Sequence, residues 1–253
     1  MIPYHDENAT ERTPVVTILL IGACVVTWVV VQGAGLDPAL ATSVCNLGLI
    51  PGELTLRLPP GAGFQMTDTL VCLTDPGRQV PNVFTSMFLH GSWMHLIGNM
   101  WFLWLFGNNI EDSMSRVSFV VFYLASGVAA AALQVVTDPA SVVPMVGASG
   151  AISGVMGAYL VLFPRVRVFT IVPLGFYITT MALPAWAMLI YWMVIQLLGG
   201  FSSIVAGGQG GGVAFWAHVG GFLAGVVLVK VFARGDRLKR HRRSHWEPGE
   251  HRG

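Results

Sequence analysis

The chain is poor in charged residues. Of its 253 residues only 11% are Asp, Glu, Lys or Arg, whereas 54% are hydrophobic. Soluble domains carry about 25% charged residues. This shortage of charge excludes an ordinary soluble enzyme and predicts an integral membrane protein. The length leaves room for several membrane spans and one sizeable loop.

Cysteine is also scarce, and no secretory leader is evident. Three cysteines are too few for a disulfide scaffold. Cys24 falls in an apolar run, whereas Cys45 and Cys72 share one loop, so the sequence leaves open whether they pair. Residues 1–13 have no basic segment, and no Ala-x-Ala-like cleavage site follows the first apolar run. We therefore expect that run to be a retained span.

The sequence lacks the usual signs of a metal centre or a transporter. There is no His-Glu-x-x-His motif, and no acidic residue inside a span completes a ligand set with His90 and His95. We expect no metal and no cofactor. A transporter or proton path is a weaker alternative, because the chain shows no inverted repeat and no internal pair of acids.

Apolar stretches close to the length of a membrane span recur six times. A span needs about 20 residues, and the candidates are 14–31, 83–106, 117–136, 146–163, 184–204 and 213–232. A loop rich in Gly and Pro, 32–81, separates the first two. Residues 168–183 are interrupted by Pro and Gly, which predicts an interfacial hairpin before the fifth span. A glycine-rich loop, 207–212, precedes the sixth.

The distribution of basic residues predicts the orientation. Eight of the fourteen Lys and Arg residues follow Val229, which marks the C-terminus as cytoplasmic. Such clusters usually meet anionic lipid, so we expect no nucleic-acid partner. Six spans return both termini to the cytoplasm and leave loop 32–81 outside. We divide the chain into a cytoplasmic segment (1–13), a six-helix membrane domain (14–233) and a basic cytoplasmic tail (234–253).

A serine and a histidine inside the apolar stretches are the candidate catalytic residues. Ser149 lies between Gly147 and Gly150 at the start of the fourth span, and His218 lies in the sixth. Polar residues at membrane depth are functional suspects, and a serine beside a histidine can be an activated nucleophile. The alternative is that both only pack helices together.

Glycine spacing favours a meeting of the two spans. Gly221 and Gly225 share a helix face with His218, and Gly150 opens a similar face that continues to Gly154 and Gly157. Small residues let helices approach closely. We therefore expect these two faces to dock and to bring His218 within reach of Ser149.

The second span adds candidate oxyanion donors. His95 and Asn99 are four residues apart, so both project from one face of a helix. An imidazole and an amide on one face could stabilise a developing oxyanion.

Together these residues resemble the rhomboid family of intramembrane serine proteases. The resemblance rests on His90-x4-His95-x3-Asn99, on Gly147-Ala148-Ser149-Gly150 and on Ala217-His218 with Gly221-x3-Gly225, and it covers about residues 13–233. It implies an all-α membrane protein, a rhomboid-like bundle of six transmembrane helices. The site would be a water-filled cavity that opens to the outside.

The resemblance also implies roles for single residues. Ser149 and His218 would form a catalytic dyad, and His95, Asn99 and the Ser149 backbone N–H would hold the oxyanion. Glu111 matches a family acid that holds the cytoplasmic helix ends. The substrates would be transmembrane segments of other proteins, and the location would be a bacterial cytoplasmic membrane. Some relatives are catalytically silent binding or quality-control proteins, which is the alternative function.

Overall fold

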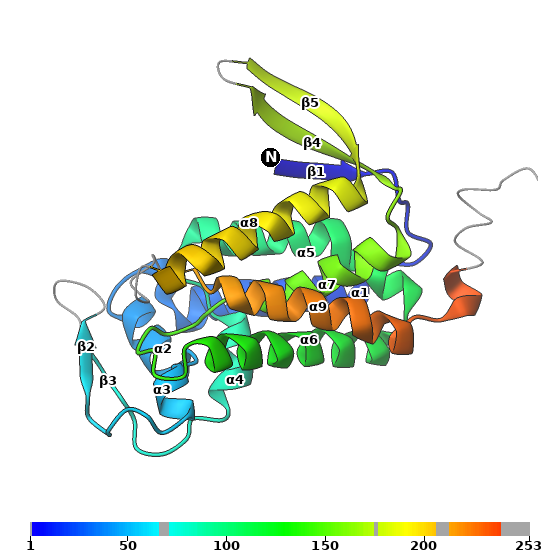
Figure 1. Cartoon of the computed structure of the whole chain (residues 1–253). Coiled ribbons are helices and arrows are strands. Elements are labelled where there is room, and N and C mark those ends of the chain that lie inside the picture. The colour runs from blue at the N-terminus through cyan, green and yellow to red at the C-terminus, as the bar shows by residue number, and fades with distance from the viewer. Residues whose placement is uncertain (1, 66–70, 175–176, 206–212, 239–253) are drawn as a thin grey trace, which may run out of the picture.

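The computed structural model describes residues 2–65, 71–174, 177–205 and 213–238. Its long helices lie side by side, and the short helices and strands of residues 33–88 gather at one end of the bundle (Figure 1). The long helices are α1 (Val15–Val26), extended by a π-helical turn (Thr27–Val31), α5 (Trp93–Ser113), α6 (Arg116–Thr137), α7 (Ser149–Leu162), α8 (Ala185–Val205) and α9 (Phe215–Phe232). The fold is therefore mostly helical.

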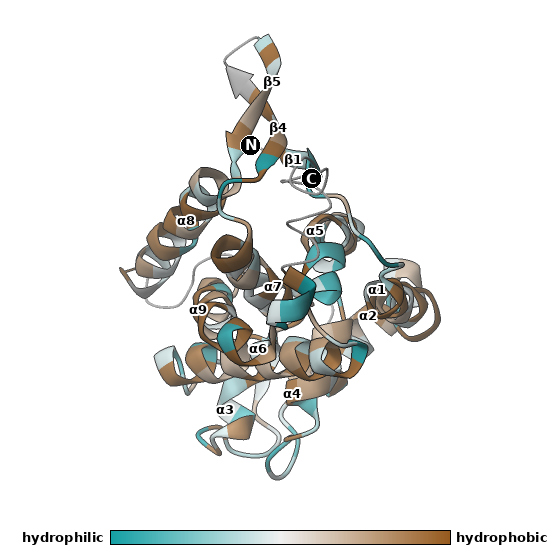
Figure 2. Cartoon of the chain, turned by 90° about the vertical axis from the view of Figure 1, so that its right-hand side faces the viewer, coloured by the Kyte–Doolittle hydropathy of each residue, from teal (hydrophilic) through white to brown (hydrophobic). Residues whose placement is uncertain are grey.

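Within the part of the chain that the structure describes, three helices are long and apolar enough to cross a membrane. They are Arg116–Thr137, Ala185–Ser203 and Phe215–Phe232, and shorter apolar helices cover Val15–Val31 and Ser149–Leu162. Most of their residues carry the hydrophobic colour in Figure 2. Lipid-facing helices keep hydrophobic surfaces, so the molecule is built as a membrane protein.

The centre of the bundle is α7. Its residues 150–159 are all buried, although many are Gly, Ala or Ser. Figure 2 places α7 between α5 on one side and α8 on the other. Small side chains on every face explain how several helices can surround a single short one.

The predicted docking of the glycine faces is confirmed. A Cβ at Gly221 would overlap the Gly150 carbonyl oxygen, and one at Gly225 would overlap that of Gly154. A Cβ at Gly157 would likewise strike the backbone of Phe222. The backbones of α7 and α9 therefore touch, and this contact sets the relation between the starts of the two helices.

The boundaries predicted for the second span, 83–106, were wrong. That region holds a short α4 (Asn82–Thr85), a 3-10 turn (Ser86–Phe88) and then α5 (Trp93–Ser113). The Ser92 hydroxyl accepts the His95 backbone N–H at 3.1 Å and caps the new helix. Hydropathy alone does not register this cap, because apolar residues lie on both sides of it.

Glu111, which lies beyond the predicted end of the second span, belongs to the last turn of α5. Glu111 is only 3% exposed, and its carboxylate accepts the backbone N–H groups of Val16 at 3.0 Å and Thr17 at 2.8 Å. It also accepts the Thr17 hydroxyl at 2.9 Å. A carboxylate at the start of α1 satisfies orphan N–H groups and meets the positive end of the helix dipole.

The description of the fold as all-α needs correction, because strands are present. The predicted hairpin forms from β4 (Arg167–Leu174) and β5 (Tyr177–Pro184), which pair antiparallel. The N-terminal β1 (Ile2–Asp6) adds to β4 as the outer strand. The hairpin is rich in Val, Ile and Thr, which favour strands. This sheet projects beside the helices, and β5 leads directly into α8 (Figure 1).

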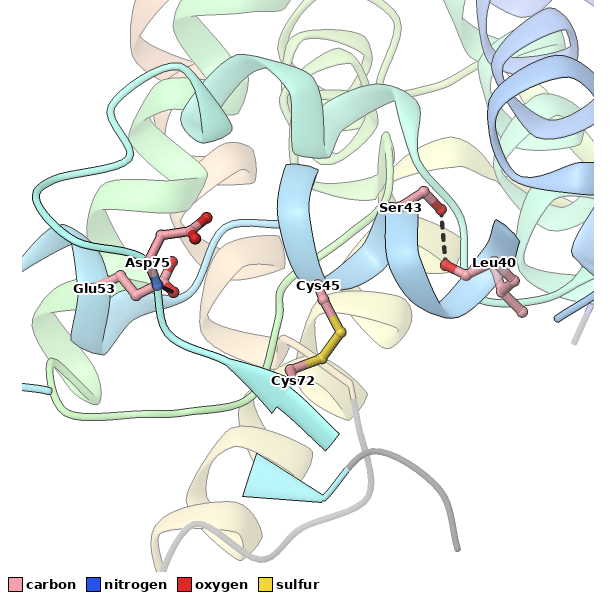
Figure 3. Close-up of a disulfide and its surroundings, with 6 residues drawn as sticks. All are labelled: Leu40, Ser43, Cys45, Glu53, Cys72 and Asp75. Atoms are coloured by element: carbon pink, nitrogen blue, oxygen red, sulfur yellow. Dashed lines mark hydrogen bonds between the residues drawn. A yellow bond between two sulfur atoms is a disulfide. The ribbon is translucent and has the colours of Figure 1, made fainter. Parts of the chain in front are cut away.

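The loop predicted at 32–81 is more structured than its composition indicates. It holds a 3-10 turn (Gly33–Gly35), α2 (Ala39–Leu47), α3 (Pro51–Leu54), β2 (Gly63–Gln65) and β3 (Val71–Leu73). Cys45 of α2 and Cys72 of β3 form a disulfide, which settles the pairing that the sequence left open (Figure 3). Glu53 of α3 accepts the Asp75 backbone N–H at 2.8 Å in the same region.

Two predicted segments lie outside the described residues. They are the glycine-rich loop 207–212 and the basic tail from residue 239 onward.

Candidate active site

Ser149 is the first residue of α7, and its position is set by the segment before it. Met145 forms an antiparallel bridge with Leu49, and the Gly147 backbone N–H donates to the Ser86 carbonyl at 2.9 Å. Gly147 has a φ of +127°, which L-residues with a side chain rarely adopt. The chain therefore reverses sharply just before the helix and presents Ser149 at its N-terminus.

His218 lies in the first turn of α9, opposite Ser149. Its Nε2 is 2.8 Å from the Ser149 Oγ. The two residues are 69 positions apart in the sequence, and the contact follows from the docking of Gly221 on Gly150. The pair has the geometry of a nucleophile and its general base.

A cavity of about 830 Å³ opens onto this pair. Its walls include Ser149, His218, His95, Asn99, Gly147 and Trp192. The volume lies in the range of small-molecule sites, about 300–1,000 Å³. The structure thus brings four polar residues that the sequence singled out to the wall of one cavity.

His95 is oriented to donate a hydrogen bond into this cavity. Its Nδ1 accepts the Gly91 backbone N–H at 3.3 Å, so the proton of a neutral ring sits on Nε2. A Cβ added to Gly147 would lie 2.7 Å from this Nε2 and 3.5 Å from the Ser149 Oγ. Glycine therefore keeps open the space between the nucleophile and His95.

Asn99 lies one turn after His95 on α5 and is 7% exposed. Its Nδ2 has no hydrogen-bond partner among the described residues. A buried amide donor without a partner is costly unless a ligand or an intermediate uses it. The arrangement supplies a second donor beside His95.

His90 does not join the face of α5 that bears His95 and Asn99, because it precedes the helix. It is fully buried, and its backbone and the Gln32 side chain exchange two hydrogen bonds of 2.8 Å each. The His90 and His95 rings meet edge to face with centroids 5.2 Å apart. His90 thus ties the end of the first helix to the start of α5. No cluster of potential metal ligands occurs in the described part of the chain.

One contact of the site escaped the sequence analysis. The side-chain oxygen of Gln196, on α8, lies 2.7 Å from the His218 Nδ1. Trp192, one turn earlier, places its ring 5.7 Å from the imidazole. The only sequence signal was a glutamine inside an apolar span, where polar side chains are costly.

The comparison with known proteins agrees with this geometry. The family model of the Rhomboid domain matches residues 77–235. That range includes α5 to α9 and all four polar residues of the cavity.

Similar curated proteins come from distant sources. Mitochondrial Rhomboid protein 1 of Saccharomyces cerevisiae is 27% identical over 169 residues, covering 64% of this chain and 44% of the yeast protein. Chloroplastic Rhomboid-like protein 11 of Arabidopsis thaliana is 29% identical over 154 residues, covering 59% and 51%. Rhomboid-like protease 5 of Toxoplasma gondii is 32% identical over 265 residues, covering 90% and 28%.

The chain spans about half the length or less of these relatives. The family match nevertheless covers more than half of the chain and contains every residue that lines the cavity except Pro51. This integral membrane protein belongs to the rhomboid family.

Proposed function

We propose that this protein is an intramembrane serine endopeptidase that cleaves transmembrane segments of other membrane proteins. The observation that carries the proposal is the 2.8 Å contact between Ser149 Oγ and His218 Nε2 at the wall of a cavity. A hydroxyl becomes a competent nucleophile when a neighbouring imidazole accepts its proton.

In this mechanism Ser149 Oγ attacks the carbonyl carbon of the scissile peptide while His218 Nε2 takes the hydroxyl proton. The tetrahedral intermediate collapses, the C–N bond breaks, and His218 returns the proton to the leaving amine. A water molecule, deprotonated by the same nitrogen, then hydrolyses the acyl-enzyme ester and frees Ser149.

The oxyanion of each tetrahedral intermediate would receive hydrogen bonds from three donors. They are the Ser149 backbone N–H at the positive end of α7, the His95 Nε2–H and the Asn99 amide. Fixed donors aimed at developing charge are among the largest contributions to catalysis. The oxyanion would occupy the space between Ser149 Oγ and His95 Nε2, which Gly147 leaves open because it has no Cβ.

The reaction constrains the substrate and the topology. A transmembrane helix must unwind locally before its carbonyl can reach Ser149, so we expect single-span substrates with small or helix-breaking residues near the cut. We further propose six membrane-spanning helices, both termini in the cytoplasm and a site that opens to the outside of a bacterial cytoplasmic membrane. The excess of Lys and Arg after Val229 supports this orientation.

The test compares the purified wild type with Ser149→Ala on a generic transmembrane substrate in liposomes. We expect cleavage by the wild type and none by the variant. A wild-type protein that neither cuts substrate nor reacts with a fluorophosphonate, although folded, would instead be a catalytically silent rhomboid that binds membrane proteins.

A further inference from the structure

The imidazole of His218 has a second hydrogen-bond partner besides Ser149. The Gln196 Oε1 lies 2.7 Å from its Nδ1. Gln196 is 7% exposed, and its Nε2 donates to the Trp192 carbonyl at 3.4 Å. Because the nitrogen end of the amide is bonded to a carbonyl, its oxygen end is the one that faces the histidine.

This amide orientation determines where the imidazole proton lies. A neutral imidazole carries one N–H, and the nitrogen that accepts the serine proton must be bare. Nε2 faces Ser149 Oγ, so the proton belongs on Nδ1. The Gln196 oxygen can only accept, and it therefore stabilises the single tautomer in which His218 can act as a base.

The face of the ring is supported by the same helix. Trp192 lies 5.7 Å from the His218 ring at an interplanar angle of 40°, and it also packs on Phe222. Ser153, one turn after the nucleophile, donates to the Ser149 carbonyl at 2.6 Å and not to the His218 ring. The edge and the face of the base are thus both contacted from α8.

We infer that Gln196 is the positioning residue of the dyad. By bringing Gln196 to His218, α8 holds the imidazole in the tautomer and orientation in which it can accept the Ser149 proton. This inference rests on the proposed function. Gln196 touches the base and not the substrate, and it has the position that the aspartate of a Ser-His-Asp triad takes. When α8 moves away from α9, His218 loses its Nδ1 acceptor and the aromatic ring beside it.

The chemistry of the site explains an amide in place of a carboxylate. Burying a charged carboxylate costs desolvation free energy, and a neutral amide avoids the cost of burying a charge. Titratable groups that face the same cavity are His95 on α5 and Asp138 at the end of α6. The Gln196 amide stabilises the Nδ1–H tautomer of His218 without adding a charge to the titratable groups of the cavity.

The experiment compares Gln196→Leu and Gln196→Glu with the wild type, and uses Leu198→Ala as a control on the same helix. Leu198 is 62% exposed on the outside of α8. Cleavage of a transmembrane substrate and the rate of fluorophosphonate labelling are measured against pH. The unfolding temperature of each variant is recorded alongside.

We expect Gln196→Leu to lower kcat on the order of 10²-fold or more with KM little changed, because orientation and tautomer of the base are lost. Gln196→Glu restores most of the rate, since a carboxylate also accepts the Nδ1–H. The acid limb of the pH–rate profile of Gln196→Glu moves to higher pH, because the carboxylate stabilises the His218 imidazolium, which must lose its proton before it can act as a base. Leu198→Ala behaves as the wild type.

Wild-type kcat and pH profile in Gln196→Leu would overturn the inference. So would a Gln196→Glu protein that folds but is as slow as the leucine variant. If Gln196→Leu does not fold, the glutamate variant decides alone, and an unshifted acid limb counts against the inference. Failure of the proposed function itself looks different, because the wild type would then match Ser149→Ala.

Discussion

At the scale of single residues, the dyad makes the sharpest prediction. Ser149→Ala and His218→Ala should each abolish cleavage, and the double variant should be no worse than either one, because the two side chains act as a unit. Steady-state cleavage of one substrate by the three variants measures this. Additive losses, or substantial cleavage by either single variant at an unchanged unfolding temperature, would contradict the mechanism.

The oxyanion donors act in the same reaction but should be less absolute. His95→Ala and Asn99→Ala each remove one donor, and such a loss costs on the order of 10²-fold in kcat. Three donors share the charge, so each single loss is softened, and the double variant loses more. Fluorophosphonate labelling should slow but persist. An unchanged rate in the double variant would remove both residues from the site.

At the scale of elements, the contact between α7 and α9 leaves no room for a side chain larger than that of glycine. Gly221→Ala would place a methyl group on the Gly150 backbone, and overpacking of this kind costs roughly 1–3 kcal/mol or more. Activity should fall with stability, because the same contact aligns Ser149 and His218. Gly22→Ala is the matched control, since nothing lies within 4 Å of a Cβ there. Equal unfolding temperatures for the two variants would refute the close approach.

The position of α8 predicts a gate. This helix packs on α9 and α7, and in Figure 2 it stands apart from α5. We expect sideways motion of α8 against α5 to admit substrate. Met94 of α5 and Ser203 of α8 both line the cavity, and cysteines placed at these two positions are treated with bifunctional thiol reagents of graded length. The remaining free cysteine, Cys24, is buried.

The crosslinked protein should fail to cut a membrane substrate and still react with a small fluorophosphonate, which enters from water. Retained labelling is also expected because the crosslink keeps Gln196 beside His218. Each single-cysteine variant treated with the same reagent is the control. Full-rate cleavage after complete crosslinking would show that substrate enters elsewhere.

At the scale of the whole molecule, Asp6 ties the N-terminal strand to two helices. Its Oδ2 accepts the Tyr159 hydroxyl of α7 at 2.5 Å and the Asn109 amide of α5 at 3.0 Å. Burial raises the pKa of Asp6 from 3.8 to about 6. The folded state therefore holds the proton more tightly than the unfolded state, and this stabilisation is full below about pH 4 and lost as the pH rises through 6.

We accordingly expect β1 to exchange its amide hydrogens faster at pH 7.5 than at pH 5, after correction for intrinsic exchange. Asp6→Asn keeps an acceptor oxygen and carries no charge, so it should remove this pH dependence and keep β1 protected. Hydrogen exchange of peptides 2–6 in both proteins measures it. Equal protection of wild-type β1 at the two pH values would contradict a protonated Asp6.

Much of this architecture follows from local pattern. Apolar runs located the stretches that hold α1 and α6 to α9, and the Pro- and Gly-interrupted segment became the β4–β5 hairpin. The start of α5 was missed because the preceding helical turn ends at Phe88 and a single capping residue, Ser92, begins the new helix within an apolar stretch. Residues 2–6 carried no strand signal of their own, since β1 depends on the edge of β4.

Ser149, His218, His95 and Asn99 could be singled out from the chain because polar groups at membrane depth are expensive and therefore rare. Hydropathy and helical spacing are local properties, so both can be read from the sequence of a single span. The 2.8 Å contact between Ser149 and His218, the burial of Glu111 beneath α1 and the Gln196 amide on the base arise only when helices pack. These contacts join residues far apart in sequence, and their distances depend on backbone approach at glycine, which no single segment encodes.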